Sequence, residues 1–145
     1  MDRSALLQFL RSQRFVVEAS VTPSGQPQAA VVGVVVTDQL EVFFDTLGSA
    51  RKAANLRANP RVAFVFGSTA PGASQTVQYE GIATEPSGPE LDALLERYFG
   101  RFADGSDRRK LIDIAYFLVR PSWIRWSDYD ADPPEVVEFT EFLSA

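Results

Sequence analysis

The feature that most constrains the fold is an apolar run at residues 29–36, AAVVGVVV, in which five of eight residues are valine. β-Branched valine favours strands over helices because its side chain packs well on a pleated surface. A strand without alternating polar residues is typical of one that is buried on both faces. We therefore predict a strand over 28–36 that needs cover on both sides.

Other apolar segments predict a sheet around this strand. They lie at 15–21, 40–45, 62–66, 76–84, 115–126 and 135–139. Most consecutive segments are joined by too few residues for a crossover, so antiparallel pairing is expected. Pro121 inside the long segment 115–126 predicts a bulge or an edge there. The pattern predicts a mainly β chain, with six to seven antiparallel strands.

Helices are expected beside this sheet. Apolar spacing predicts a helix over 2–14, and Ser49 is expected to cap a short helix that runs through Ala58. Ser87 and Glu90 have the spacing of a capping box, and Gly100 is the expected stop of the helix that follows. These flanking helices give the sheet part of the cover that it needs.

Length and composition suit one domain over 1–145, because 46% of the 145 residues are hydrophobic and no long linker or repeat divides the chain. Closing the sheet into a barrel covers one face of each strand. Helices or a second subunit must cover the other face. We therefore expect a homodimer on physical grounds alone.

The chain contains no cysteine and no histidine. This excludes disulfides, thiol catalysis, Cys/His zinc sites and nucleophile relays that use histidine. A net charge of −5 argues against nucleic-acid binding. No segment resembles a membrane span or a signal peptide, so a cytoplasmic location is expected. We expect any catalysis to be carried by a bound cofactor.

Basic residues stand at the start of the helix that follows residue 49. Arg51 and Lys52 lie in its first turn, where cations oppose the helix dipole. The Ser49 hydroxyl and the free N–H groups of that turn could join the two cations in binding an anion. The pattern is not a Walker A loop. The alternative, that Arg51 and Lys52 are ordinary surface charges, stays open.

Two further patterns near the C-terminus were considered. Asp128, Asp130 and Asp132 alternate as in a calcium loop, but the required Gly and Glu positions hold Pro133 and Phe139, so no metal site is predicted. The segment 123–126, Trp-Ile-Arg-Trp, indicates either a stacking platform for a planar ring or simple core packing.

Several short segments together resemble a known family. They are Gly25-Gln26-Pro27, Phe44-Asp45-Thr46, Gly48-Ser49-Ala50-Arg51-Lys52 and Asn59-Pro60-Arg61-Val62. In this order they resemble the pyridoxamine 5′-phosphate oxidase-like flavin-binding proteins. The resemblance implies an FMN-binding split β-barrel with flanking helices. It also implies a homodimer with FMN at the subunit interface.

The resemblance assigns roles to individual residues. Arg51, Lys52 and Ser49 would hold the flavin phosphate, and Asp45 and Thr46 match the strand end beside the cofactor. The backbone of residues 30–35 would lie along the flavin ring. The candidate residues in that strand are Val31, Val32, Gly33 and Val34, with Gly33 allowing close approach.

Two further positions are assigned more remotely. Thr76 falls where the family has a glutamine that meets the flavin. Trp126 or Trp123 would wall the site from the partner chain.

The chain also departs from the family pattern. Ala30 and Val35 replace the basic residues at the two ends of the ring-lining strand, and the C-terminal Trp-Gly-Gly segment is missing. Oxidation of pyridoxamine phosphate is therefore not expected. The resemblance implies an FMN-dependent oxidoreductase that acts on an unknown small molecule, possible donors including a nicotinamide. The alternatives are a deazaflavin-dependent reductase and a non-catalytic flavin-binding or sensor protein.

Overall fold

The computed structural model describes residues 1–110 and 113–142. In chain order its elements are α1 (Arg3–Ser12), β1 (Phe15–Val21), β2 (Pro27–Gly33), β3 (Val35–Val36), β4 (Val42–Leu47), α2 (Arg51–Ala58), β5 (Arg61–Gly67), β6 (Gln75–Thr84), α3 (Gly88–Arg101), α4 (Gly105–Lys110), β7 (Ile114–Asp128) and β8 (Glu135–Phe139). The predicted mainly β architecture with a few helices is confirmed.

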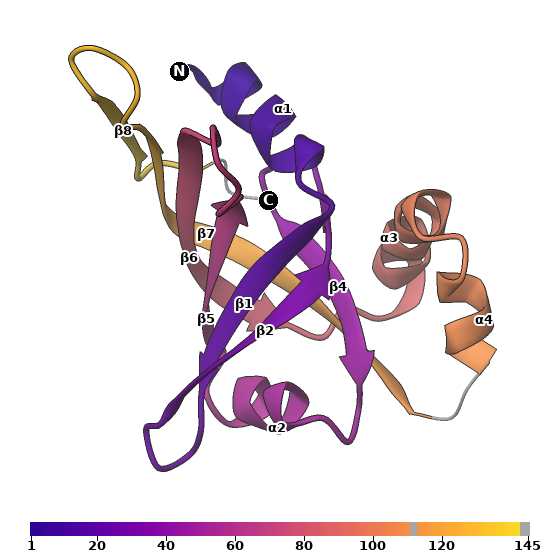
Figure 1. Ribbon diagram of the computed structural model, residues 1–145. Helices are drawn as coiled ribbons and strands as arrows, with labels where there is room; N and C mark the ends of the chain where they lie inside the picture. Colours follow the sequence, from indigo (N-terminus) through magenta and orange to yellow (C-terminus); the bar gives the residue numbers. More distant parts are fainter. Residues whose placement is uncertain (111–112, 143–145) are drawn as a thin grey trace.

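The strands form one antiparallel sheet in the order β2-β1-β5-β6-β7-β4-β3, and β8 pairs with β7. β2 and β3 follow each other in the chain, with only Val34 between them, yet they stand at opposite ends of this order. The sheet must therefore curl until its two edges meet, which makes the split barrel of Figure 1.

The break at Val34 is a difference from the sequence-based expectation. Residues 28–36 were predicted as one strand, but the N–H of Val34 donates to the carbonyl of Arg14 at 3.1 Å and leaves the ladder. β2 then pairs with β1, whereas β3 pairs with β4. Over the described residues the sheet therefore has eight strands rather than six or seven, because one apolar run contributes a strand to each edge of the barrel.

Helices cover three sides of the barrel. In Figure 1, α1 and α2 lie at its opposite ends, and α3 and α4 stand beside it. Inside the barrel, a core that includes Phe44, Phe64 and Tyr79 is completed by Leu6 and Leu10 of α1 and by Ala53 and Leu56 of α2.

A second apolar cluster joins α3 to the outside of β3, β4 and β7, and it contains Val35, Phe43, Leu95, Tyr98 and Tyr116. α3 runs one residue past Gly100, so the predicted stop at this glycine is wrong; the C-cap is Phe102. Ser87 is the N-cap as predicted, but its side chain makes no capping hydrogen bond.

The bulge predicted near Pro121 is present. The register between β6 and β7 shifts between Glu80 and Gly81, and Gly81 faces Pro121. A Cβ atom at Gly81 would lie 2.4 Å from the carbonyl oxygen of Arg120, so only glycine fits this close approach.

Among the residues that the structure describes, no helix lies over the outward side of β2, β1 and β5 (Figure 1), and we call this side the outer face. Val17 pairs with Val31 on one side and Val65 on the other, and Ala19 lies between Ala29 and Ala63 in the same way. Val17, Val31 and Val65 are 38%, 67% and 48% exposed. The prediction that the apolar run is buried on both faces is therefore confirmed for residues 34–36. It is wrong for residues 29–31 in a single chain, because Ala29 and Val31 are exposed.

Across residues 1–110 and 113–142, no helix is long and apolar enough to span a bilayer.

Candidate functional site

The first turn of α2 presents free N–H groups. The helix begins at Arg51, and its N-cap is Ala50, which has no side chain able to accept a capping hydrogen bond. The predicted cap Ser49 lies one residue too early and is exposed. A helix start without a side-chain cap leaves backbone donors available for an external acceptor.

Lys52 lies between this helix and the barrel. Its Nζ is 3.4 Å from the hydroxyl of Thr46, so the structure brings together two of the predicted cofactor residues. Arg51 is exposed on the neighbouring position. Beside the two cations is a small cavity of about 110 Å³, which we call the α2 pocket. It is lined by Glu18, Ser20, Gln28, Ala29, Ala30, Arg51 and Lys52.

A buried polar cluster forms the inner wall of the α2 pocket. The side-chain amide of Asn55 donates to the Ser20 hydroxyl at 3.2 Å and to Oε1 of Gln28 at 2.7 Å. Glu18, Ser20 and Asn55 are all less than 5% exposed. The sequence did not single out these residues, although the alternation of β1 puts Glu18 and Ser20 on the same side as buried Val16.

Glu18 is the most unusual member of this cluster. Glu18 is 1% exposed, and its Oε1 has no hydrogen-bond partner among the described residues. Burial raises the pKa of this carboxyl above its ordinary value, and the Ser20 hydroxyl and the charge of Lys52 offset only part of the shift. A carboxyl that resists ionisation therefore lies beside the two cations.

Asp45 belongs to a different environment from Thr46. The two residues are neighbours on β4, so their side chains point to opposite faces. The Asp45 carboxylate pairs with Arg108 of α4 at 3.0 Å, and Arg108 also contacts Asp104. Asp45 is therefore engaged under α3 and α4, and neither Asp45 nor Thr46 lines the α2 pocket.

Gly33 of the ring-lining strand lies against Phe102. A Cβ atom there would lie 2.7 Å from the ring of Phe102, so the missing side chain makes room for this ring. Val32 is buried inside the barrel, whereas Val31 points outward. Val34 is fully buried in the core.

Thr76 and Trp126 do not line the α2 pocket. Thr76 pairs with Gly67 of β5, and Trp126 stands near the end of β7, opposite Val77. The indole of Trp126 is buried in the barrel core and donates to Gln75. It is therefore not available to face a partner chain, and Trp123, on the outer side, is less buried.

Comparison with solved structures identifies proteins of the same fold. The heme binding protein from Mycobacterium smegmatis aligns with a TM-score of 0.83 at 20% identity over 97% of this chain, which spans only 58% of that protein. The heme storage protein HutZ from Vibrio cholerae gives 0.72 at 19% identity, covering 81% of this chain and 88% of that one.

A pyridoxamine 5′-phosphate oxidase-related, FMN binding protein from Nostoc punctiforme gives a TM-score of 0.68 at 14% identity, over 98% of this chain and 94% of that one. At these identities the similarity establishes the split-barrel fold alone.

A search of curated protein sequences found no significant match. The family model for pyridoxamine 5′-phosphate oxidase, however, matches residues 3–127. This range includes the α2 pocket, the outer face, β1 to β6 and β7 up to Ser127, and by this match the chain belongs to the pyridoxamine 5′-phosphate oxidase family.

Proposed function

We propose that this protein binds FMN as a homodimer and serves as a flavin-dependent oxidoreductase of a small molecule. The observation that carries the proposal is the uncapped start of α2 with Arg51 and Lys52 beside the α2 pocket. The flavin phosphate is the part of FMN that this arrangement suits. Ser49 stands next to the same helix start and is a further donor to the phosphate.

The charge arrangement supports a phosphate ligand. Cations in the first turn of a helix cost a few tenths of a kcal/mol because they oppose the helix dipole. A phosphate reverses this cost, since it accepts hydrogen bonds from the helix N–H groups and pairs with both cations. Lys52 is held toward the barrel by Thr46, which leaves it close to the pocket.

The flavin ring fits best along β2. Ala29 and Ala30 line the α2 pocket, and their small side chains leave the main chain of β2 within reach of a flat ring. Val31 is the outward residue that follows them. The Phe102 ring over Gly33 limits the ring site on the side toward β3.

A dimer accounts for the exposed apolar residues of the outer face. Val17 lies between Val31 and Val65, and the three side chains are 38%, 67% and 48% exposed. Adjoining exposed apolar residues are typical of an interaction surface, so a second chain is the natural cover of this face.

FMN, when bound, supplies the hydride-accepting chemistry that the side chains of this protein lack. The chain's own part is to bind the phosphate, to align the ring and to exclude water. Pyridoxamine phosphate is not proposed as the substrate. Ala30 has no charge, and Val35 is packed beneath α3, so neither end of the strand offers a cation to a substrate phosphate.

Heme is the second cofactor to consider, because two solved structures of the same fold are heme proteins by name. Heme iron is usually held by His, Cys, Met or Tyr. This chain has no His or Cys, a single Met and four Tyr, of which Tyr79, Tyr98 and Tyr116 are buried. FMN therefore suits its residues better. A deazaflavin with a longer acidic tail would need more cations than the two at the α2 pocket. A flavin store or sensor is the non-catalytic alternative.

The proposal is tested by titrating FMN and riboflavin into wild type and Lys52→Ala. Each charge-assisted contact contributes about 1.5–3 kcal/mol, so FMN should bind roughly tenfold to a hundredfold more weakly to the variant. Riboflavin, which lacks the phosphate, should be nearly unaffected.

Lys110→Ala is the matched control, because Lys110 is 80% exposed on α4. Equal losses for FMN and riboflavin would contradict a phosphate role for Lys52. A hemin titration run in parallel, with tighter binding of hemin than of FMN, would favour the heme alternative. Reduction of the bound flavin by a nicotinamide separates an enzyme from a flavin store.

A further inference from the structure

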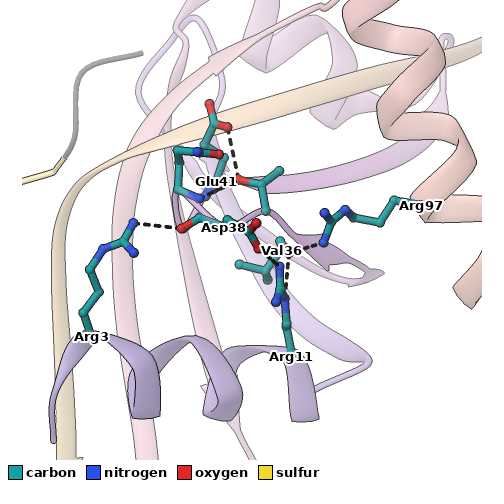
Figure 2. Close-up of polar contacts among 8 residues, drawn as sticks. Arg3, Arg11, Val36, Asp38, Glu41 and Arg97 are labelled. Atoms are coloured by element: carbon teal, nitrogen blue, oxygen red, sulfur yellow. Dashed lines mark hydrogen bonds and ion pairs between the residues drawn. The ribbon is translucent and has the colours of Figure 1, made fainter.

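Four arginines gather where α1, α3 and β3 meet, away from the α2 pocket. Arg11 belongs to α1 and Arg14 follows it, while Arg97 and Arg101 are one turn apart on α3. Figure 2 shows Arg11 and Arg97 approaching the same point, the carbonyl of Val36, from their two helices. The concentration is local, because the whole chain has a net charge of −5.

The guanidinium groups lie close to one another. Nε of Arg11 donates to the Val36 carbonyl at 3.0 Å, and Nη1 of Arg97 donates to the same oxygen at 3.4 Å. Two cations that share one neutral acceptor repel each other without compensation from that acceptor.

Arg101 and Arg14 extend the group. Nη1 of Arg101 donates to the carbonyl of Arg11 at 2.9 Å, and Nη2 of Arg14 donates to the carbonyl of Arg101 at 3.2 Å. The Arg14 guanidinium also lies over the Phe102 ring, 4.9 Å from its centre. Their acceptors are backbone carbonyls, which leave the positive charge uncancelled.

Negative charge around these arginines is sparse. Asp38 pairs with Arg11 at 2.7 Å, but its side chain is 72% exposed. Over residues 1–110 and 113–142, no carboxylate lies within 4.0 Å of a guanidinium nitrogen of Arg14, Arg97 or Arg101. Nε of Arg101 is buried and has no hydrogen-bond partner within the same described ranges. Burial and the nearby charge of Arg14 together lower the pKa of Arg101.

An open cleft of about 360 Å³ lies in front of the group, and we call it the arginine cleft. It is lined by Arg11, Val35, Val36, Arg97, Gly100 and Arg101. Gly100 stands inside α3, where glycine is unfavourable by up to about 1 kcal/mol relative to alanine. A Cβ atom there would meet nothing within 4 Å, so packing does not require this glycine. Its effect is to keep the cleft wall open between two arginines.

We propose that the arginine cleft is a binding site for a small anion that carries a phosphate or carboxylate group, held by Arg97 and Arg101 with Arg11. Guanidinium groups match both kinds of oxyanion through paired hydrogen bonds. A bound oxyanion would supply the negative charge that the surrounding residues lack. This site is independent of the α2 pocket and of FMN.

The test is calorimetric titration of inorganic phosphate and of citrate into wild type and Arg97→Ala/Arg101→Ala, with sodium chloride at matched ionic strength. Wild type should bind at least one of the two anions saturably, and the double variant should bind it at least tenfold more weakly. Whichever anion binds more tightly identifies the phosphate or the carboxylate as the preferred group.

The matched control is Arg61→Ala/Arg109→Ala, which removes two exposed arginines elsewhere on the molecule and should bind as wild type does. Arg51→Ala/Lys52→Ala removes binding at the α2 pocket and should leave the second site intact. The proposal would be overturned if neither phosphate nor citrate bound more tightly than chloride. It would also be overturned if Arg61→Ala/Arg109→Ala weakened anion binding as much as Arg97→Ala/Arg101→Ala.

Gly100→Leu keeps all charges and tests the cleft even if the double alanine variant fails to fold. Leucine is a better helix former, so the variant should melt no lower than wild type. It should lose anion binding, because its side chain fills the cleft. Unchanged binding in Gly100→Leu would show that the arginines only tie α1 to α3.

Discussion

The two faces of β1 contrast in a way that reverses the usual pattern. Toward the barrel interior point Val16, Glu18 and Ser20, of which two are polar, and all are less than 5% exposed. Toward the outside points the apolar set, including Phe15 at 58% and Val17 at 38% exposure. The protein therefore buries a carboxyl and a hydroxyl while it exposes a phenylalanine and a valine from the same strand.

In a single chain, the buried polar groups and the exposed apolar groups of β1 both reduce the free energy of unfolding. Burying a polar group without full hydrogen bonding costs about 1–3 kcal/mol, and exposed apolar area forgoes about 25 cal/mol per Å². A function at each face explains why the sequence accepts both costs. The inner polar cluster adjoins a pocket with two cations, and the outer face is suited to cover by a second chain.

Breaking the outer face should have the largest effect. Val17→Asp places a charge between Val31 and Val65, where an unpaired charge buried in a dimer costs about 3–5 kcal/mol. The dimer dissociation constant should rise roughly a thousandfold. Sedimentation equilibrium measures the change.

Val136→Asp is the control, since this β8 valine is 41% exposed and lies outside the outer face. Its dissociation constant should match that of wild type. A wild-type protein that sediments as a 16.0 kDa monomer at micromolar concentration would refute the role given to the outer face.

Disrupting the buried polar cluster of Glu18, Ser20 and Asn55 should have a smaller effect on free energy. Asn55→Ala removes the hydrogen bonds to Ser20 and Gln28 and leaves both groups without this partner in a buried place. We expect a loss of about 2 kcal/mol in the free energy of unfolding, measured by urea denaturation. Asn59→Ala removes one exposed contact to the Arg61 N–H and should cost clearly less. Equal losses of unfolding free energy in Asn55→Ala and Asn59→Ala would mean that the buried polar cluster contributes no more to stability than an exposed contact does.

Neutralising Glu18 should give the smallest effect, and one of opposite sign. Because burial raises the pKa of Glu18, its contribution to stability is full below its ordinary value of 4.5 and is lost as the pH rises through the higher value in the folded protein. Glu18→Gln escapes this loss, so it should be more stable than wild type at neutral pH, by roughly 1 kcal/mol.

That gain should vanish in acid, below the ordinary pKa of a glutamate. Thermal melts at several pH values measure it, with the exposed Glu135→Gln as the control. A destabilised Glu18→Gln at neutral pH would instead show that the ionised carboxylate and Lys52 form a favourable pair.

Local patterns predicted much of the fold. The strands at 15–21 and 135–139 have the predicted limits, because turns or loops bound them directly. The bulge opposite Pro121 also followed from one residue. The break at Val34 could not be predicted, since it depends on the carbonyl of Arg14, which is remote in sequence.

In the candidate site, too, contacts between residues close in sequence were predictable, whereas contacts between remote segments were not. Lys52 and Thr46 meet as the resemblance implied, because both lie at the same turn between β4 and α2. The contact between Gly33 and the Phe102 ring could not be predicted, since Phe102 comes from another part of the chain. The alternation of side chains along β1 is sufficient to place Glu18 and Ser20 inside the barrel with Val16. The arginine cleft joins three separate elements, so spacing along the sequence does not reveal it.

The central claim is that FMN binds at the α2 pocket, beside the inner side of β1, and that a second chain covers the outer face. The most direct measurement is sedimentation velocity of the purified, FMN-saturated protein, recorded by flavin absorbance and by protein absorbance together. The account predicts that both signals move as one species of twice the 16.0 kDa chain mass, with one flavin per chain. Flavin that sediments with a 16.0 kDa monomer, or a dimer that carries no flavin at saturation, would contradict it.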